Sequence, residues 1–440
     1  LCALAIAVLV AMLLPKSQMR FRAGSGVFGA IFGTYVERSN YAPSSISDVK
    51  RLFDELRGSA PKRLSPIFSY LYYKATPVGG AWSCTLAQRF VLSSPLVYMH
   101  RLNGKIDNDR TWLAGTPLKT VQNSLAKTDE QLIGVPSSSY VTLGAWVATL
   151  AHGNTGALFK TPLIQVRARV LDKALGIVTM DEPAVLLDKF GGSDVRANQF
   201  VVLSVTLPEQ LPTNQSLRRS CRLVRTTEDA EWFLRDSTLM RALFVGRSGS
   251  LGMTWTPLQP GEPKPTGAGL FDKLRVLMLA GLGWGAPDLK GKEGEEKVSD
   301  AVYYFPDTIS NIQNLVQVYM AYVNAEFFTT LPLTTAALLQ IVKELQRTHA
   351  KIGGRTELRI HNKTVYFDVA LYESVDNFAT YFETLARLGV QKAAQHRGKH
   401  RRSPKEFEKA GIEPVDAKSS WQVELAALAG RPSRARAQES

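Results

Sequence analysis

The order of apolar and polar residues predicts short helices and strands that alternate along the first half of the chain. Apolar residues three and four positions apart predict a helix within residues 41–61, with Ser45 or Ser47 as its N-cap. Residues 111–134 have the pattern of a strand, a turn and an amphipathic helix. Runs rich in β-branched and aromatic residues predict further strands at 65–73, 95–102, 162–172, 175–180 and 199–208.

The second half of the chain carries longer helical patterns, separated by segments that cannot build a packed core. Residues 257–269 are rich in Pro and Gly and residues 289–297 are charged, so both are expected to be loops or poorly ordered linkers. Helices are expected at 307–328, 334–354 and 374–389, and strands at 356–360 and 363–371.

Composition places the chain among folded proteins of two or three domains. It has 440 residues, of which 45% are hydrophobic and 21% are charged. Its cysteines, Cys2, Cys84 and Cys221, are far apart and form no CxxC motif, which argues against a disulfide framework and a zinc site. The formal charge of +14 permits several anionic partners, but no nucleic-acid-binding motif accompanies the basic clusters. Nucleic acid is therefore not expected as a partner.

The first fourteen residues are apolar and are followed by Pro15, Lys16, Arg20 and Arg22. A membrane-spanning helix needs about 20 residues, so this run is short for a span by itself. We expect residues 1–22 to be a hydrophobic anchor with a basic flank, which would make the protein membrane-associated. A signal-peptide core and a buried helix are the alternatives.

Two separate segments have the residues that a phosphate-bearing cofactor needs. Gly79 and Gly80 supply a tight turn whose N–H groups could approach a pyrophosphate, and Ser83 follows closely. Residues 135–156 supply a second surface with many hydroxyl groups, although a helix-capping cluster is the alternative there. His152 could contact the cofactor or form a hydrogen bond within its own turn. The residues expected at the cofactor are Gly79, Gly80, Ala81, Trp82, Ser83, Pro136, Ser137, Ser138, Thr142, Gly144, Thr149, His152, Gly153 and Val201.

Five segments carry the most specific motifs of the chain, in the order YAPSSISDVKRLFDELR, TPVGGAWSC, TWLAGTPLKTVQNSLA, VPSSSYVTLGAWVATLAHGNTG and AQHRGKH. The first four resemble the flavin-binding domain of the vanillyl-alcohol oxidase and p-cresol methylhydroxylase (PCMH) family. The fifth resembles the His-x-Gly-Lys element of the sugar and aldonolactone oxidases. The resemblance covers most of residues 41–212 and, more loosely, 355–405.

The resemblance implies an α+β fold with a two-subdomain PCMH-type FAD-binding domain, an α+β substrate (cap) domain and the N-terminal hydrophobic segment. The FAD-binding domain is expected at 36–212 and the cap domain at 213–395, with a flexible loop at 257–300. The C-terminal segment, 396–440, is expected to return to the FAD-binding domain and to end in a basic tail.

The resemblance also implies that the cofactor is FAD and that it is bound noncovalently. Family members that tether the flavin through the first turn use a His where this chain has Trp82. Members with a second tether use a Cys where Pro136 and Ser137 stand. The bulky ring of Phe200 stands where the family often has glycine, and it could crowd the nucleotide.

Three residues of the second half match the family's catalytic positions. Lys399 aligns with a lysine placed near the flavin N1–C2 oxygen, where a cation stabilises the reduced ring. Glu357 and Arg359 resemble the Glu-x-Arg pair of the substrate pocket. The alternatives are a solvated basic run for Lys399 and a surface cross-strand ion pair for the other two. His396 and His400 have helical ligand spacing, but no acid accompanies them and neighbouring arginines would repel a cation, so no metal is expected.

The implied function is an FAD-dependent oxidation of an alcohol or a sugar-like lactone by hydride transfer to flavin N5. A second hypothesis is a catalytically inactive structural or assembly subunit with the same fold, anchored in a membrane and bound to protein partners. Trp82, Phe200 and Ala370 favour this second hypothesis, because Ala370 stands where the family keeps a hydroxyl side chain.

Overall fold

The computed structural model describes residues 42–58, 76–78, 96–106, 110–132, 134–137, 141–153, 165–190, 199–259, 261, 293–301, 322–361, 364–372, 374–396, 399 and 402–416. The N-terminal apolar run and the first glycine turn, residues 79–83, lie outside this part of the chain. The predictions made for them stay predictions.

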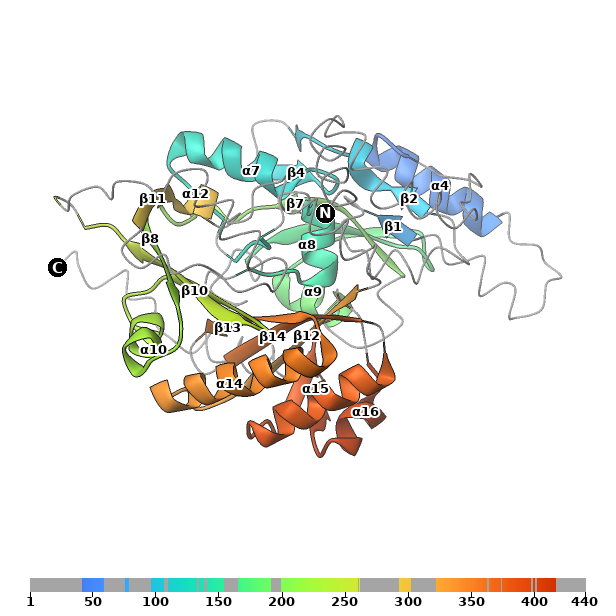
Figure 1. Ribbon diagram of the computed structural model, residues 1–440. Coiled ribbons are helices and arrows are strands. Elements are labelled where there is room, and N and C mark those ends of the chain that lie inside the picture. The colour runs from blue at the N-terminus through green and yellow to red at the C-terminus, as the bar shows by residue number, and fades with distance from the viewer. Residues whose placement is uncertain are drawn as a thin grey trace, which may run out of the picture.

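The first sheet has five antiparallel strands: β3 (Lys105–Ile106), β4 (Thr111–Leu113), β5 (Arg167–Asp172), β6 (Ile177–Asp181) and β7 (Phe200–Thr206). Their order is β3-β4-β7-β5-β6. The helices of this half are α4 (Ile46–Gly58), α7 (Leu118–Leu125), α8 (Leu143–Thr149) and α9 (Pro183–Phe190). A short parallel pair, β1 (Thr76–Val78) and β2 (Leu96–Tyr98), lies beside them (Figure 1).

The second sheet has nine strands in the order β11-β8-β10-β9-β13-β14-β12-β15-β16, and only its last pair is parallel. The strands are β8 (Ser216–Leu223), β9 (Met240–Gly246), β10 (Gly249–Pro257), β11 (Glu293–Lys297), β12 (Tyr322–Thr330), β13 (Arg355–His361), β14 (Thr364–Tyr372), β15 (Lys392–Gln395) and β16 (Glu413–Val415). The helices of this half are α10 (Thr227–Leu234), α12 (Val298–Ala301), α14 (Thr335–Ile352), α15 (Val375–Arg387) and α16 (Pro404–Lys409).

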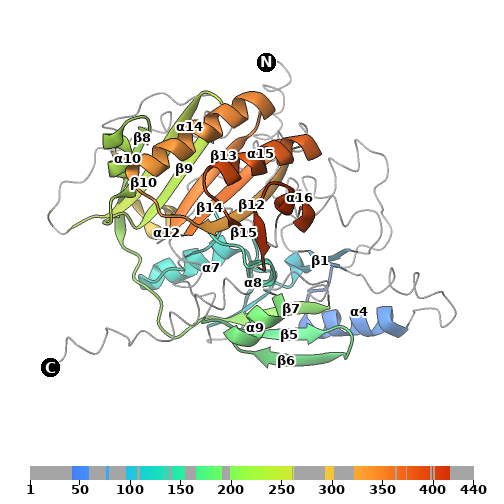
Figure 2. The ribbon, with the colours of Figure 1, turned by 90° about the horizontal axis from the view of Figure 1, so that it is seen from below.

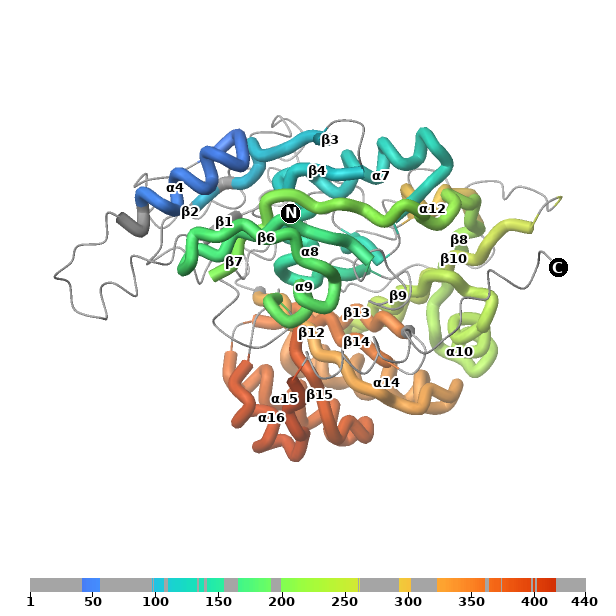
Figure 3. Tube along the Cα trace, turned by 180° about the vertical axis from the view of Figure 1, so that it is seen from behind, coloured from blue at the N-terminus to red at the C-terminus, as the bar shows by residue number. Residues whose placement is uncertain are grey.

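The two faces of the nine-stranded sheet have different surroundings. Along β12, Val323, Ala325 and Phe327 belong to the core shared with α14 and α15. Figure 2 shows these two helices lying across that face of the sheet. Because side chains alternate along a strand, Glu326 and Phe328 point to the opposite face, and Phe328 packs in the core shared with the five-stranded sheet. Figures 1 and 3 show α8 between the two sheets, so this second face looks toward α8.

Most helices and strands predicted from apolar spacing are confirmed where the structure describes them. Helix α4 begins after Ser45, whose hydroxyl accepts a hydrogen bond from the Asp48 N–H at 3.1 Å, and it buries Val49, Leu52 and Phe53. The predicted helices within 111–134, 334–354 and 374–389 are α7, α14 and α15. The predicted strands include β2, β4, β5, β6, β7, β13 and β14.

The helix predicted at 307–328 is wrong over its described part, since residues 322–328 belong to β12. Apolar and polar residues alternate there with a period of two, from Val323 to Phe327, and β12 pairs with β14 along its whole length. The segment is a strand because it pairs with β14 on one side and with β15 on the other.

The loop predicted at 289–297, and the flexible loop at 257–300, are wrong for their described C-terminal part. Residues 293–297 form β11, which pairs with β8 and is followed by α12 with Val298 buried. Glu296 forms an ion pair with Arg219 and accepts a hydrogen bond from Trp255 Nε1 at 3.1 Å. The charge run is therefore paired against a basic strand, which lets a polar segment form a sheet edge.

At the level of fold class, the chain is a mixed α/β structure with antiparallel and mixed sheets, in agreement with α+β. Within the described residues, no helix is both long enough and apolar enough to cross a membrane.

His349, at the end of α14, makes the second half of the fold sensitive to acid. Its Nδ1 donates to the Gly353 carbonyl at 2.9 Å, so its Nε2 accepts from the Thr356 hydroxyl at 2.8 Å. Burial lowers the pKa of this imidazole to about 4. In the unfolded chain the pKa of this histidine is about 6.5. Between about pH 6.5 and 4, the imidazole is therefore protonated in the unfolded chain but neutral in the folded one.

We predict that stability contributed by neutral His349 is fully present above about pH 6.5 and decreases by about 3 kcal/mol as the pH falls toward 4. Urea unfolding of the parent and of His349→Gln at several pH values measures this. The variant, which cannot titrate, should lose clearly less stability over the same interval. An equal loss in both proteins would contradict the assignment to His349.

Candidate functional site

Three carboxylates lie side by side on the face of the nine-stranded sheet that looks toward α8. The strand register places Glu357 of β13 opposite Asp368 of β14, and Asp368 opposite Glu326 of β12. Like charges directly opposite each other on neighbouring strands destabilise a sheet. This row therefore needs cations close by.

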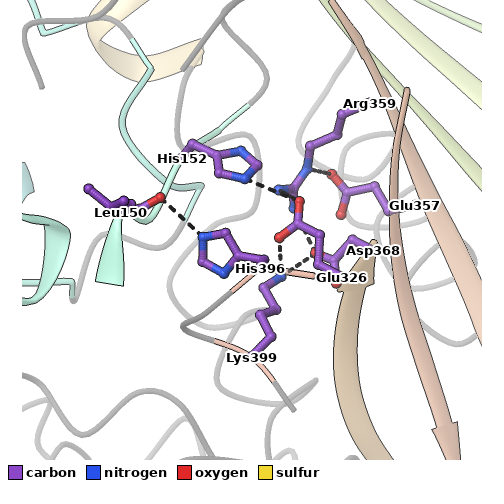
Figure 4. Close-up of polar contacts among 8 residues, drawn as sticks. All are labelled: Leu150, His152, Glu326, Glu357, Arg359, Asp368, His396 and Lys399. Carbon is purple, nitrogen blue, oxygen red and sulfur yellow. Dashed lines mark hydrogen bonds and ion pairs between the residues drawn. The ribbon is translucent and has the colours of Figure 1, made fainter. Parts of the chain in front are cut away.

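Two cations supply that charge. Arg359, two residues after Glu357 and thus on the same face, donates from Nε to Glu357 at 3.0 Å and from Nη2 to Asp368 at 2.8 Å. Its Nη1 lies 3.3 Å from Glu326. Lys399 follows β15, and its Nζ lies 2.5 Å from Asp368 and 3.5 Å from Glu326. Figure 4 shows the two cations on either side of the carboxylates.

Glu326 is the centre of this cluster and is only 1% exposed. Burial by itself would raise the pKa of its carboxyl group, but the charge interactions with His152, Lys399 and Arg359 outweigh burial and hold that pKa well below its usual range. The side chain is therefore ionised at neutral pH. The predicted catalytic residues Lys399, Glu357 and Arg359 meet around this carboxylate, and they lie in a buried network and not in a surface ion pair.

Two histidines complete the cluster from the other side. The Nε2 atom of His396 donates to the Leu150 carbonyl at 3.1 Å, which leaves its Nδ1 without a proton in the neutral ring. The ring of His152 lies 5.0 Å from that of His396, centroid to centroid. Burial lowers the pKa of both imidazoles, to about 3 for His152, so both are neutral at neutral pH.

The contact between His152 and Glu326 is close but incomplete. The His152 Nε2 atom lies 3.3 Å from Glu326 Oε1, yet the two groups are not aligned for a hydrogen bond. Within the described residues, this buried nitrogen therefore has no hydrogen-bond partner. An unsatisfied buried polar atom is costly, and a bound ligand could satisfy it.

A left-handed residue at the end of α8 brings His152 to the cluster. Leu150 has φ 52° and is buried, although only glycine adopts this conformation at low cost. The turn ends the helix and exposes the Leu150 carbonyl to His396. Immediately afterwards, Gly153 passes so close to Val135 that a Cβ atom would lie 2.0 Å from the Val135 carbonyl oxygen. Local backbone conformation thus fixes the position of His152.

The remaining residues of the predicted cofactor segment serve mainly the chain itself. Thr142 is the N-cap of α8, and its hydroxyl accepts from the Ala145 N–H. The Gly144 N–H donates to the Ala114 carbonyl at 2.7 Å. The Thr149 hydroxyl donates to the Ala145 carbonyl at 2.7 Å. The Gly144 N–H and the Thr149 O–H are therefore already used within the fold.

The other predicted cofactor residues are dispersed or not described. Pro136 is buried and Ser137 is half-buried, close to the chain turn at Gly153. Val201 is fully buried in the core of the five-stranded sheet. Residues 79–83 and Ser138 lie outside the described residues.

The described residues offer two groups that a flavin ring could contact. The unsatisfied His152 nitrogen and the Lys399 ammonium group lie beside the same buried carboxylate. For the phosphate groups, the predicted Gly144 N–H is not available, because it already donates a hydrogen bond to the Ala114 carbonyl. Phosphate contacts would have to involve other groups, including those of residues 79–83.

The geometry also brings together a possible metal-ligand set that the sequence spacing did not predict. Ligand atoms of His152, Glu326 and His396 lie within 4.8 Å of one another. However, Arg359 and Lys399 already contact the Glu326 carboxylate, and a metal ion would have to compete with both. The charges favour an ion-pair network over a metal centre.

Sequence reasoning missed Glu326 and Asp368 and gave His396 only a rejected metal role. Glu326 lies in the segment 307–328, for which the sequence predicts a helix, and a helix would not place it beside Asp368. The available signal was a single acidic residue within each of two strongly apolar strands, VNAEFFTT and TVYFDVALY. A charge in such a position is costly unless it is paired.

Comparisons with models of known protein families and with curated proteins found no match for this chain.

Proposed function

We propose that the protein is an FAD-dependent oxidoreductase that oxidises an alcohol or a sugar-like lactone. One observation carries the proposal. His152 belongs to the predicted cofactor segment, and it lies in one buried cluster with Glu357, Arg359 and Lys399, the three predicted catalytic residues. These residues come from separate parts of the chain, and the resemblance places the last three in one active site and the segment of His152 at the cofactor.

The proposal includes a PCMH-type arrangement of the chain. A five-stranded sheet with flanking helices, next to a larger sheet that carries the catalytic residues on its facing side, supports such an arrangement. The proposal also retains a noncovalent FAD and an association with membranes through residues 1–22.

Each residue of the cluster has a role in this proposal. When bound, a flavin would supply the hydride acceptor. Lys399 would hold a positive charge near the ring oxygen, and Asp368 and Glu326 would fix its ammonium group in place. Glu357 and Arg359 would orient the substrate hydroxyl groups through hydrogen bonds.

An absorbance spectrum of the purified protein tests the proposal. Flavin bands that bleach when an alcohol or a lactone is added under anaerobic conditions would support it. A protein that stays colourless after incubation with FAD would contradict it.

A second candidate is a catalytically inactive subunit with the same fold. The observation in its favour is that Arg359 and Lys399 are already paired with the chain's own carboxylates, as in a purely structural network. A colourless protein whose unfolding temperature does not change with FAD would support this candidate.

A further inference from the structure

We infer that His152 and Glu326 together recognise one hydroxyl group of the substrate. In this arrangement the His152 Nε2–H donates a hydrogen bond to the hydroxyl oxygen, and the Glu326 carboxylate accepts a hydrogen bond from the hydroxyl group. The inference rests on the proposed function, because it takes the buried cluster as the substrate site. It makes both residues specificity-determining, in favour of an alcohol and against a carbonyl compound or an ether of the same shape.

His152 has unused hydrogen-bonding capacity. Its side chain is 4% exposed, and its Nε2 atom has no hydrogen-bond partner among the described residues. The same atom lies 3.3 Å from Glu326 Oε1, and a neighbouring carboxylate favours the neutral tautomer with the proton on Nε2. The ring therefore presents a buried N–H donor that the described residues leave unsatisfied, which is costly unless a ligand pairs with it.

Glu326 can also accept a further hydrogen bond. Its carboxylate oxygens lie 3.3 Å from His152, 3.3 Å from Arg359 and 3.5 Å from Lys399. Hydrogen bonds between a cationic N–H and a carboxylate are typically about 2.7–2.9 Å long, so these contacts are all loose. An ionised carboxylate has about four acceptor positions, and a ligand O–H at normal distance would form its shortest hydrogen bond.

The distance between the two groups suits a single bridging oxygen. His152 Nε2 and Glu326 Oε1 are close but not aligned for a direct hydrogen bond. An oxygen atom about 2.8 Å from both could pair with each of them. That oxygen must accept on one side and donate on the other, which a hydroxyl group does and a carbonyl or ether oxygen does not. A water molecule meets the same requirement, so the substrate hydroxyl competes with water for this place.

Both groups are held in place by the fold. The His152 ring packs at centroid distances of 4.9 Å from Tyr366 and 5.0 Å from His396. Glu326 is positioned by the pairing of β12 with β14. Figure 4 shows the His152 ring pointing toward the Glu326 carboxylate. Because the two groups are positioned before a ligand binds, little additional ordering is needed to recognise a hydroxyl group.

The pair also distinguishes the alcohol from its oxidised product. A carbonyl oxygen can still accept from His152, but it has no proton for Glu326 and places its lone pairs against the carboxylate. A buried site that hydrogen-bonds a hydroxyl group rejects analogues that lack it, because its polar groups are left unpaired. The product should therefore bind more weakly than the substrate, which favours its release.

An NMR titration of the full chain, with ¹⁵N-labelled histidine, tests the inference. The probes are cyclohexanol, cyclohexanone and methoxycyclohexane, which share one ring and carry a single oxygen each, so each reports on one hydrogen-bonding position. The His152 signals are assigned by their absence from the spectrum of His152→Phe. We expect cyclohexanol to shift the His152 Nε2 signal and to bind about 10- to 100-fold more tightly than the other two probes.

Two substitutions separate the roles of the pair. Glu326→Gln exchanges one acceptor oxygen for an NH₂ group that can donate to a carbonyl, so the preference for cyclohexanol over cyclohexanone should shrink by about tenfold or more. His152→Phe removes the donor and should weaken cyclohexanol binding by about tenfold, as followed through the neighbouring His396 signal. His152→Gln restores a side-chain N–H donor and should recover most of that affinity.

His349→Gln is the matched control. His349 is also a buried histidine, but it bonds to Thr356, which precedes Glu357 on β13 and so points to the opposite face of the sheet. This variant should keep the probe preference of the wild type. If Glu326→Gln does not fold, the His152 variants and the order of the three probes on the wild type decide the inference.

Three results would overturn the inference: equal binding of cyclohexanol and cyclohexanone, an unchanged preference in the folded Glu326→Gln protein, or a His152 signal that no probe shifts. The last result would mean that the pair holds water only. The assay needs neither flavin nor turnover. A colourless protein that prefers cyclohexanol at His152 would refute the oxidoreductase and keep the hydroxyl-binding pair. A flavoprotein that alcohols reduce, but whose His152 signal ignores cyclohexanol, would do the reverse.

Discussion

Replacing Lys399 with methionine should slow substrate-dependent bleaching of the flavin bands by about 100- to 1,000-fold. The Lys399 ammonium group is held at 2.5 Å from Asp368 and is the cation that the proposed function places next to the ring. Removing a preorganised charge at the place where negative charge develops typically costs this much. Stopped-flow absorbance with saturating substrate under anaerobic conditions measures the rate.

Lys392→Met is the control for this prediction, because Lys392 is also a lysine of the β15 region but is 62% exposed and pairs with exposed Glu413. Its rate should equal that of the wild type. A Lys399→Met protein that binds FAD and is reduced at the normal rate would exclude Lys399 from the chemistry. Such a result would favour the role of Lys399 as a structural ion-pair partner.

Replacing Arg359 with methionine should lower the free energy of unfolding by about 3–5 kcal/mol at neutral pH. Its side chain is only 7% exposed and contacts Glu326, Glu357 and Asp368. Without the guanidinium group, the row of buried carboxylates would lose the cation that contacts all three of them. Urea unfolding followed by tryptophan fluorescence gives the difference, which should narrow at acid pH as the carboxylates take up protons.

The matched substitution is Arg347→Met on α14, where the arginine is 60% exposed and pairs with Glu344 within the same helix. An exposed pair of this kind contributes about 0–1 kcal/mol, so this variant should resemble the wild type. Equal effects of the two substitutions would show that the cluster around Glu326 is not a buried charge network.

The sequence predicted most of the local elements because each has its own periodic signal. The apolar spacing of α4, α7, α14 and α15 fixes which side of each helix is buried. The β-branched and aromatic residues of β7 and β14 likewise favour a paired strand. Two segments, β11 and β12, are strands where the sequence predicts a loop and a helix. The charged run of β11 has no apolar period, and the period of two in β12 covers only a few residues of a longer apolar segment. Cross-strand partners therefore decide the conformation of both.

The candidate site was accessible to sequence reasoning only through the resemblance of motifs. That resemblance named Lys399, Glu357, Arg359 and His152, and these four converge around a single carboxylate. It did not name the carboxylate. The importance of Glu326 arises from the register of β12 on β14, which is a property of the folded sheet and not of any short segment.

The sequence by itself determined where most helices and strands form, because the periodic spacing of apolar residues depends only on neighbours along the chain. Tertiary structure alone decided the charge balance of the site. It did so by aligning three carboxylates across strands β13, β14 and β12 and by directing Arg359 and Lys399 onto them. Electrostatic energy depends on distance and burial, and both are set only when remote segments meet.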